Sequence, residues 1–261
     1  MVLNFVVDFN TSWSDRIAGG SDPWFCRSVH KGESSKARIP AIPYPNVMFW
    51  LVAGITGVAA LFRFYALGVP SLWIDEGFSV VTARALLEHG YPLLPGGETS
   101  WNYLPAHGLM ALGLSLFSDL ELGARFFPAL AGTLLVPAFY FLNRLVFRSR
   151  VQALTAIILL AFLAYEIGWS RQARGYVILQ FFMVLAIACY YRFLDRPSAG
   201  SLWMALIFTL LSILSHRAGY LVPLVLVLAS MCGWKDMKNG LRWAAQHKGH
   251  LAGMLVSGLL F

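Results

Sequence analysis

The strongest constraint on the fold of this chain is a series of long apolar runs separated by short polar segments. Of its 261 residues, 58% are hydrophobic and only 13% are charged. A helix needs about 20 consecutive apolar residues to cross a bilayer, which leaves room for roughly six or seven spans. The pattern therefore predicts an all-α, polytopic bundle of transmembrane helices. It excludes a disordered chain and argues against an ordinary soluble domain.

The expected helices fill residues 47–261, which we interpret as one transmembrane module. A first span at 47–68 is followed by a polar stretch at 69–101. Later apolar helices are expected at residues 104–118, 123–145, 151–168, 176–191, 202–215 and 218–234. A last apolar run, 251–261, stops before it is long enough for a span, so we expect the module to be truncated at its C-terminus.

Residues 1–46 differ from this module because they are polar and basic and end in a proline-rich stretch. They lack the apolar core and small-residue cleavage site of a signal peptide. We interpret them as a cytoplasmic, largely disordered leader; an extension from a start codon assigned too early fits the same residues equally well. Over the whole chain the net charge is +7, but the basic residues form no single patch, so no nucleic-acid partner is expected.

The positive-inside rule predicts the orientation of the module. Basic clusters in the leader and in three later loops indicate a cytoplasmic N-terminus, with residues 69–101, 165–175 and 216–218 on the outer face. This arrangement requires that one of the segments between 101 and 147 does not cross. The segment 104–118 is the shorter candidate, and we expect it to lie in the outer interface.

The first outer loop contains two adjacent carboxylates, Asp75 and Glu76. Ser71 as a possible N-cap and Gly90 as a C-terminal stop predict a helix from about 74 to 88. Its amphipathic pattern suits the membrane interface. Such a carboxylate pair indicates a general base, a metal site or a plain solvated turn. No metal-ligand spacing supports a cofactor, although Glu166 would complete a divalent-ion site if it folded back.

Basic residues on the same predicted face suggest an anion site. Arg171 and Arg174 are three positions apart, so on a helix they would share a face and could clamp a phosphate. The alternative is interfacial anchoring beside Trp169 and Tyr176. Other ionisable residues near the ends of apolar runs are structural or supporting candidates: Arg63, His107, Arg125, Glu166 and His216.

These stretches together resemble the GT-C glycosyltransferases, in particular the dolichyl-phosphate-mannose protein mannosyltransferase and aminoarabinose transferase-like group. The aromatic residue followed by Asp-Glu at 73–76, the segment around Pro105 and Arg125, SRQARGY at 170–176 and SHRAGYLVPL at 215–224 carry the resemblance in the same order. A lysine that meets the donor phosphate in some members is absent near Leu104-Pro105.

The resemblance implies a membrane enzyme that moves a sugar from a polyprenyl-phosphate donor to a lipid, glycan or protein acceptor on the outer face. Asp75 would be the catalytic base, with Glu76 orienting it or sharing its role. Arg171, Arg174 and Arg125 would bind the donor phosphate. The possible supporting residues are Tyr176, Glu166, His216 and His107. An in-line displacement would invert the anomeric carbon, without a cofactor. A bacterial inner (plasma) membrane of the cell envelope is the expected location.

Two other functions fit the same composition. A multi-pass transporter would also need several spans and intramembrane charges, but no paired broken helices or internal repeat are evident. A non-catalytic membrane scaffold or fragment fits the short chain. An acyl- or phosphotransferase lacks an obvious nucleophile–histidine arrangement.

Overall fold

The computed structural model describes residues 45–99, 101 and 103–232. The chain divides into two units, Met1–Pro43 and Tyr44–Phe261, and all described residues belong to the second. The predicted leader at 1–46 lies almost wholly outside the described residues. The apolar run at 251–261 lies outside them as well.

The described part is helical, which confirms the predicted all-α class. The described residues contain no β-strand, only an isolated β-bridge between Leu93 and Thr99. The elements in chain order are α2 (Pro45–Phe64), α3 (Ile74–His89), α4 (Leu104–Leu116), α5 (Leu120–Phe147), α6 (Arg150–Phe162), α7 (Ala164–Ser170), α8 (Tyr176–Asp195), α9 (Ala199–Ser215), the 3-10 helix η2 (Arg217–Leu221) and α10 (Val222–Cys232).

Three of the described helices, α2, α5 and α8, are long and apolar enough to cross a membrane. The predicted single span at 151–168 is instead two helices, α6 and α7, which meet at a 61° bend and qualify only as a pair. The described residues therefore contain three candidate spans, or four if the bent pair is one span, whereas the roughly six or seven expected spans refer to the capacity of the whole chain. Helix α9, with 17 residues, and the apolar stretch Arg217–Leu228 fall short of a spanning length.

Helix α5 is the centre of the bundle, because it packs against α2, α4, α6 and α8. Helix α4 approaches α5 closely at two glycines: a Cβ on Gly113 would overlap the carbonyl oxygen of Gly123. With 13 residues, α4 is about 20 Å long, well short of the roughly 30 Å hydrocarbon core. Its length agrees with the interfacial position expected from the sequence.

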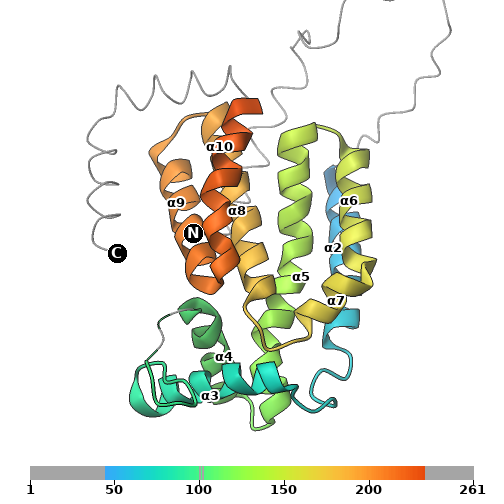
Figure 1. The fold of residues 1–261 in the computed structure, drawn as a ribbon. Helices are drawn as coiled ribbons and strands as arrows, with labels where there is room; N and C mark the ends of the chain where they lie inside the picture. Colours follow the sequence, from blue (N-terminus) through green and yellow to red (C-terminus); the bar gives the residue numbers. More distant parts are fainter. Residues whose placement is uncertain (1–44, 100, 102, 233–261) are drawn as a thin grey trace, which may run out of the picture. The chain divides into compact units, whose positions relative to one another are not determined.

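Helix α3 runs across one end of the bundle beside α4 (Figure 1). It begins after Trp73, whose backbone N–H donates to Glu76, and it ends at Gly90, which has a left-handed φ of 78°. The predicted bounds and the Gly90 stop are confirmed, but Ser71 is not the cap. Ile74, Phe78 and Val81 leave an exposed apolar edge along α3, as an interfacial helix requires.

Candidate active site

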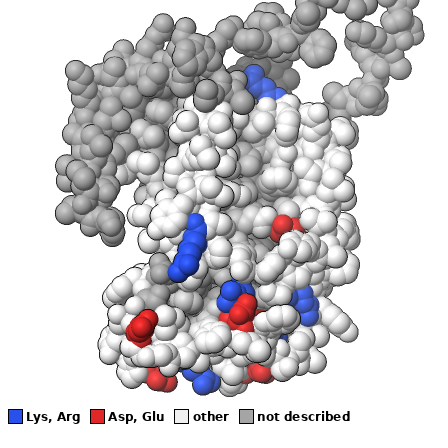
Figure 2. Space-filling model, in the orientation of Figure 1, with Lys and Arg blue, Asp and Glu red and all other residues white. Residues whose placement is uncertain are grey.

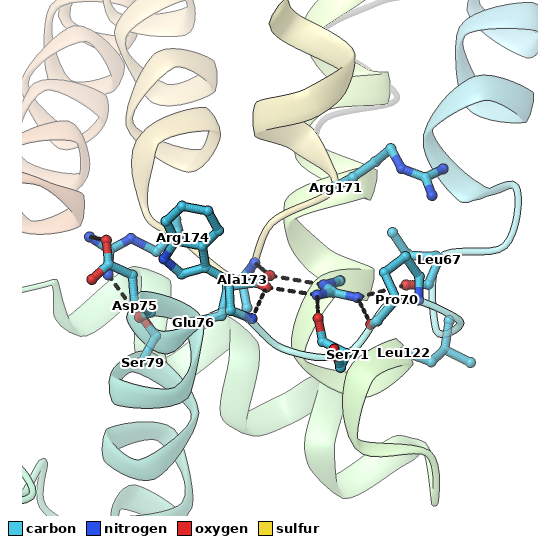
Figure 3. A network of polar contacts seen from close by, with 12 residues as sticks. Leu67, Pro70, Ser71, Asp75, Glu76, Ser79, Leu122, Arg171, Ala173 and Arg174 are labelled. Atoms are coloured by element: carbon cyan, nitrogen blue, oxygen red, sulfur yellow. Dashed lines mark hydrogen bonds and ion pairs between the residues drawn. The ribbon is translucent and has the colours of Figure 1, made fainter.

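Glu76 lies in the first turn of α3, with its carboxylate enclosed by N–H donors (Figure 3). Arg125 of α5 donates to both oxygens, from Nε to Oε1 at 2.8 Å and from Nη2 to Oε2 at 2.7 Å. The backbone N–H of Ala173 donates to Oε1 at 2.7 Å, and that of Trp73 to Oε2 at 3.0 Å. The pair is buried, with side chains 5% and 3% exposed.

The surroundings of Glu76 favour its charged form. Burial alone would raise the pKa of this carboxyl. The hydrogen bonds from Arg125, Trp73 and Ala173 and the charge of Arg125 outweigh that effect, so the pKa of Glu76 lies below its usual value. Because its partners lie on α5 and in the linker between α7 and α8, the charged Glu76 side chain joins the start of α3 to both.

Arg125 uses its remaining N–H groups on the loop before α3. Nη1 donates to the carbonyls of Leu67 and Pro70 at 3.2 and 2.6 Å, and Nη2 donates to that of Ser71 at 3.1 Å. With the two bonds to Glu76, each of its five N–H groups has an acceptor. The guanidinium that we predicted as a phosphate ligand is thus fully occupied within the protein.

Asp75 has a very different environment from its neighbour. Its side chain is 60% exposed, and its Oδ2 lies 3.7 Å from Nη2 of Arg174, which is 25% exposed. Nη1 of Arg174 also donates to the backbone carbonyl of Asp75 at 2.9 Å. The guanidinium carbon of Arg174 lies 5.6 Å from the ring centre of Tyr176. A solvent-accessible carboxylate thus faces a partly exposed cation.

Arg171 and Arg174 do not share a helix face, which corrects the sequence-based expectation. Helix α7 ends at Ser170 and α8 begins at Tyr176, so both arginines lie in a non-helical linker and point in opposite directions (Figure 3). Arg171 turns towards the end of α2, where it donates to the carbonyls of Phe62, Tyr65 and Ala66 at 3.0, 2.5 and 3.4 Å. These contacts attach the linker to α2.

Arg63 is completely buried within the bundle. It donates to the carbonyl of Ala59 at 3.2 Å and to those of Ala161 and Leu160 at 3.4 and 3.5 Å. The last two carbonyls belong to the final turn of α6, where the bend before α7 deprives them of helical partners. Arg63 therefore supports the bend and lies away from solvent.

Aromatic and histidine side chains gather next to Arg174. The ring of His216 lies 5.3 Å from Tyr103 and 4.5 Å from Tyr176, and Tyr103 lies 6.0 Å from His107 (centre to centre). Burial, reinforced by the nearby charge of Arg174, lowers the pKa of His107 to about 4. Burial and the charges of Arg174 and Arg217 also lower the pKa of His216. Both histidines are thus favoured in the neutral form.

Metal ligands do not converge on this site in the described residues, where no group of three or more His, Cys, Asp or Glu side chains occurs. Glu166 of α7 does not fold back towards Asp75 and Glu76; it accepts a hydrogen bond from Gln180 at 3.1 Å. Two shallow cavities of about 310 and 390 Å³ lie elsewhere, beside Arg84 and Glu88 on α3, and none of the candidate site residues lines them.

The structure also brings in two residues that the sequence analysis did not single out. Tyr103 precedes His107 by four positions, a spacing that places two side chains on the same face of a helix and could have indicated their contact. Ala173 contributes only its backbone N–H, which any residue but proline possesses, so no side-chain pattern could have revealed it.

Comparison with known proteins connects this geometry to a family. Residues 109–234 match the family model described as dolichyl-phosphate-mannose-protein mannosyltransferase. The chain is also 32% identical over 165 residues to an uncharacterized protein of Aquifex aeolicus (strain VF5); the match covers 61% of this chain. It covers 33% of that relative, so the chain spans about a third of its length. No solved structure matches the chain.

The matched segment contains all of α5 to α10, and with them Arg125, Arg171 and Arg174. With the three candidate spans, the match supports an integral membrane protein. It confirms the resemblance predicted from the sequence: the chain is similar to GT-C membrane glycosyltransferases of the dolichyl-phosphate-mannose-protein mannosyltransferase type.

Proposed function

We propose that this chain forms part of an integral-membrane enzyme that transfers a sugar from a polyprenyl-phosphate donor to a lipid, glycan or protein acceptor. The observation that carries the proposal is the pairing of Asp75 with Arg174. An exposed carboxylate 3.7 Å from a partly exposed guanidinium offers a base and an anion ligand side by side. The family match covers residues 109–234, which include Arg174 but not Asp75, and it supports glycosyl transfer only as a broad class of reaction.

Asp75 is the proposed general base. Its carboxylate removes the proton of the acceptor hydroxyl as the acceptor oxygen forms a bond to the anomeric carbon of the sugar. The bond between that carbon and the phosphate oxygen breaks, and the phosphate oxygen keeps the electron pair. Attack from the face opposite the phosphate inverts the anomeric carbon.

Arg174 is the proposed ligand of the donor phosphate. Negative charge grows on the phosphate oxygen as its bond to the sugar breaks, and a cation already in position stabilises that charge. A phosphate that leaves as an anion needs no proton, so the proposal contains no general acid. It contains no cofactor either. Arg174 also donates to the backbone of Asp75, which fixes the spacing between base and anion site.

Glu76, Arg125 and Arg171 are proposed to position the site. Glu76 and Arg125 hold the first turn of α3 against the backbone N–H of Ala173, the residue directly before Arg174. Arg171 attaches the other end of the same linker to α2. With Arg125 and Arg171 engaged in backbone contacts, Arg174 is the arginine best placed to meet a substrate.

The position of this site suits a donor with a lipid tail. Charged side chains gather at the end of the bundle where α3 and α4 lie, and the described surface beyond it is largely uncharged on the face seen in Figure 2. A polyprenyl tail would stay among the apolar helices, with its phosphate at Arg174. We propose that this end faces outward from a bacterial inner membrane, with the N-terminus in the cytoplasm, as the positive-inside rule indicates.

The test uses membranes from cells that express the full-length gene or its Asp75→Asn variant. A panel of radiolabelled polyprenyl-phosphate sugars is supplied, and the release of label from the lipid is followed. We expect release from one donor, and a loss of about 100-fold or more in the variant. Asp119→Asn is the matched control, because Asp119 is an exposed carboxylate that only caps α5.

Absence of release from every donor, with folded protein present, would contradict the proposal. A multi-pass transporter would then move substrate with the lipid linkage intact. A non-catalytic scaffold would show neither transfer nor transport. Release that is the same in wild type and Asp75→Asn would keep the transferase and reject Asp75 as its base.

A further inference from the structure

The aromatic group beside Arg174 has features that packing alone does not explain. Tyr103, Tyr176 and His216 come from three separate elements, and all three side chains are partly exposed. Gly175 precedes Tyr176, and a Cβ added there would overlap the carbonyl oxygen of Ser215 and lie 3.3 Å from Cβ of Ala106. This close approach brings Tyr176 against His216.

Tyr103 is held in an unfavourable backbone conformation. Its φ of 63° and ψ of 20° lie in the left-handed region, which bulky residues rarely adopt. Such conformations persist where the surrounding structure enforces them, and they cluster at ligand sites. Here the conformation directs the Tyr103 ring between His107 and His216.

The two histidines have polar atoms without a hydrogen-bond partner among the described residues. Nδ1 of His216 accepts the N–H of Ala218 at 3.1 Å, so in the neutral ring Nε2 carries the proton and can donate. Nδ1 of His107 is buried and has no hydrogen-bond partner among the described residues. A buried polar atom of this kind is normally satisfied by protein, water or ligand.

We propose that Tyr103, Tyr176 and His216 form a subsite for a pyranose ring, with Nε2 of His216 hydrogen-bonded to one of its hydroxyl groups. Aromatic faces carry negative charge density that suits the apolar, slightly positive C–H face of a sugar. Uncharged donors and acceptors beside them suit hydroxyl groups. The guanidinium carbon of Arg174, 5.6 Å from the Tyr176 ring centre, puts an anion site next to this ring.

The subsite rests on the proposed function, and it assigns the pyranose to the donor lipid. A donor carries a sugar joined directly to a phosphate, and the aromatic group adjoins Arg174 in the same way. The sugar of a glycan acceptor has similar chemistry but carries no phosphate. The two sources can therefore be separated by comparing lipids with and without the sugar.

Equilibrium binding to the full chain in lipid nanodiscs tests the subsite without requiring transfer. The probes are undecaprenyl phosphate and the sugar-bearing donor identified by label release, or a panel of undecaprenyl-phosphate sugars. We expect Tyr176→Leu and Tyr103→Asn to weaken binding of the sugar-bearing lipid about tenfold. Binding of the sugar-free lipid should change less than twofold. Arg174→Gln should weaken both lipids.

Controls separate recognition from folding. Phe49→Leu, a change of an exposed aromatic residue on α2, should bind as wild type. Tyr176→Phe keeps the ring and should weaken binding of the sugar-bearing lipid less than Tyr176→Leu does. Asparagine tolerates a left-handed φ, which offsets part of the packing that the Tyr103 ring contributes to the core, so Tyr103→Asn should still fold while it loses affinity. A loss of stability without a selective loss of affinity would show that Tyr103 only packs.

Three results would overturn the donor-sugar subsite: equal weakening of both lipids, no weakening of either, or an effect confined to the acceptor KM in transfer assays. Failure of the proposed function looks different. If wild type binds the sugar-bearing lipid selectively but releases no label, transfer fails and the subsite stands. If wild type binds neither lipid, both proposals fail.

Discussion

Asp75 and Glu76 are adjacent in the sequence, carry the same charge and each face an arginine, yet their environments are opposite. The Glu76–Arg125 pair is buried, with its closest contact at 2.7 Å and side chains 3% and 5% exposed. The Asp75–Arg174 pair is open, with atoms 3.7 Å apart and side chains 60% and 25% exposed. A one-residue step along α3 is enough to point one carboxylate into the bundle and the other out of it.

The difference indicates a division of labour between the two pairs. Glu76 and Arg125 share their polar atoms with each other and with the backbone, so little remains for a substrate. Asp75 keeps an accessible carboxylate, and Arg174 lies within reach of both Asp75 and Tyr176. We therefore expect changes in the buried pair to affect folding and changes in the open pair to affect transfer.

The largest expected effect on stability comes from breaking the buried pair. Glu76→Gln leaves the Arg125 charge enclosed without its counter-charge, which should reduce the free energy of unfolding by about 3–5 kcal/mol. Chemical unfolding of detergent-solubilised protein measures this loss, with Asp75→Asn as the matched variant, expected to change it by about 1 kcal/mol or less. Equal stability of the two variants would remove the distinction between the pairs.

A double variant sharpens the same point. Glu76→Leu combined with Arg125→Met removes both buried charges, which relieves the penalty of an unpaired ion. The backbone N–H groups of Trp73 and Ala173 and three carbonyls of the loop before α3 nevertheless lose their partners. We expect partial recovery relative to Glu76→Gln. Full recovery would show that these backbone contacts contribute little.

The free energy of unfolding should fall in two separate steps as the pH is lowered. The pKa of His107 is about 4 in the folded protein and 6.5 ordinarily, so the unfolded chain binds more protons between these values. The free energy of unfolding should therefore fall by about 3 kcal/mol as the pH drops from 6.5 to 4. His107→Leu should abolish this decline. An unchanged pH profile in His107→Leu would assign the decline to another group.

Protonation of Glu76 should lower the free energy of unfolding at a lower pH than protonation of His107. Its folded pKa lies below the ordinary 4.5, so its stabilising contribution is fully present above that value and is lost as the pH falls through the lower folded pKa. This second step should persist in His107→Leu and disappear in Glu76→Gln. Its survival in Glu76→Gln would contradict the assignment.

The two linker arginines should give different responses. Arg174→Gln removes the proposed phosphate ligand, so transfer should fall about 100-fold while unfolding changes little. Arg171→Gln removes hydrogen bonds to three carbonyls at the end of α2, so the free energy of unfolding should fall by about 1 kcal/mol. Single-turnover transfer and chemical unfolding are measured on both variants. An equal loss of transfer in the two variants would show that both arginines bind the phosphate together.

The smallest expected effect concerns a third carboxylate at this end of the bundle. Asp119 caps α5 by accepting the N–H of Leu122 at 2.6 Å. Asp119→Ala should reduce the free energy of unfolding by about 1 kcal/mol, and Asp119→Asn, which caps almost equally well, should change it little. Neither should affect transfer. A loss of transfer in Asp119→Asn would show that any nearby negative charge matters.

Local signals in the sequence were sufficient for α3 and its end. The amphipathic pattern and Gly90 predicted a helix from about 74 to 88, and the structure has Ile74–His89 followed by Gly90. The same reading found the Asp-Glu pair and the arginines that come together at this end of the bundle. Hydrophobic periodicity and helix stop signals depend on residues within a few turns of one another in the sequence. Such local signals are enough to predict where a helix like α3 begins and ends.

Long-range partners decided the rest of the site. Arg125 is 49 positions from Glu76, and nothing near Glu76 in the sequence shows which carboxylate it meets. The bend between α6 and α7 is supported by Arg63, nearly a hundred positions away, so residues 151–168 looked like one continuous helix. For the same reason, spacing alone could not show that Arg171 and Arg174 point in opposite directions.

The most direct test of the division of labour compares Asp75→Asn with Glu76→Gln in parallel. Each protein is purified, its folded fraction is measured, and single-turnover transfer from the same donor is expressed per folded molecule. We predict that Asp75→Asn folds normally and loses transfer, whereas Glu76→Gln is less stable and its folded fraction retains most transfer. Normal transfer in Asp75→Asn, together with its loss in folded Glu76→Gln, would contradict the account.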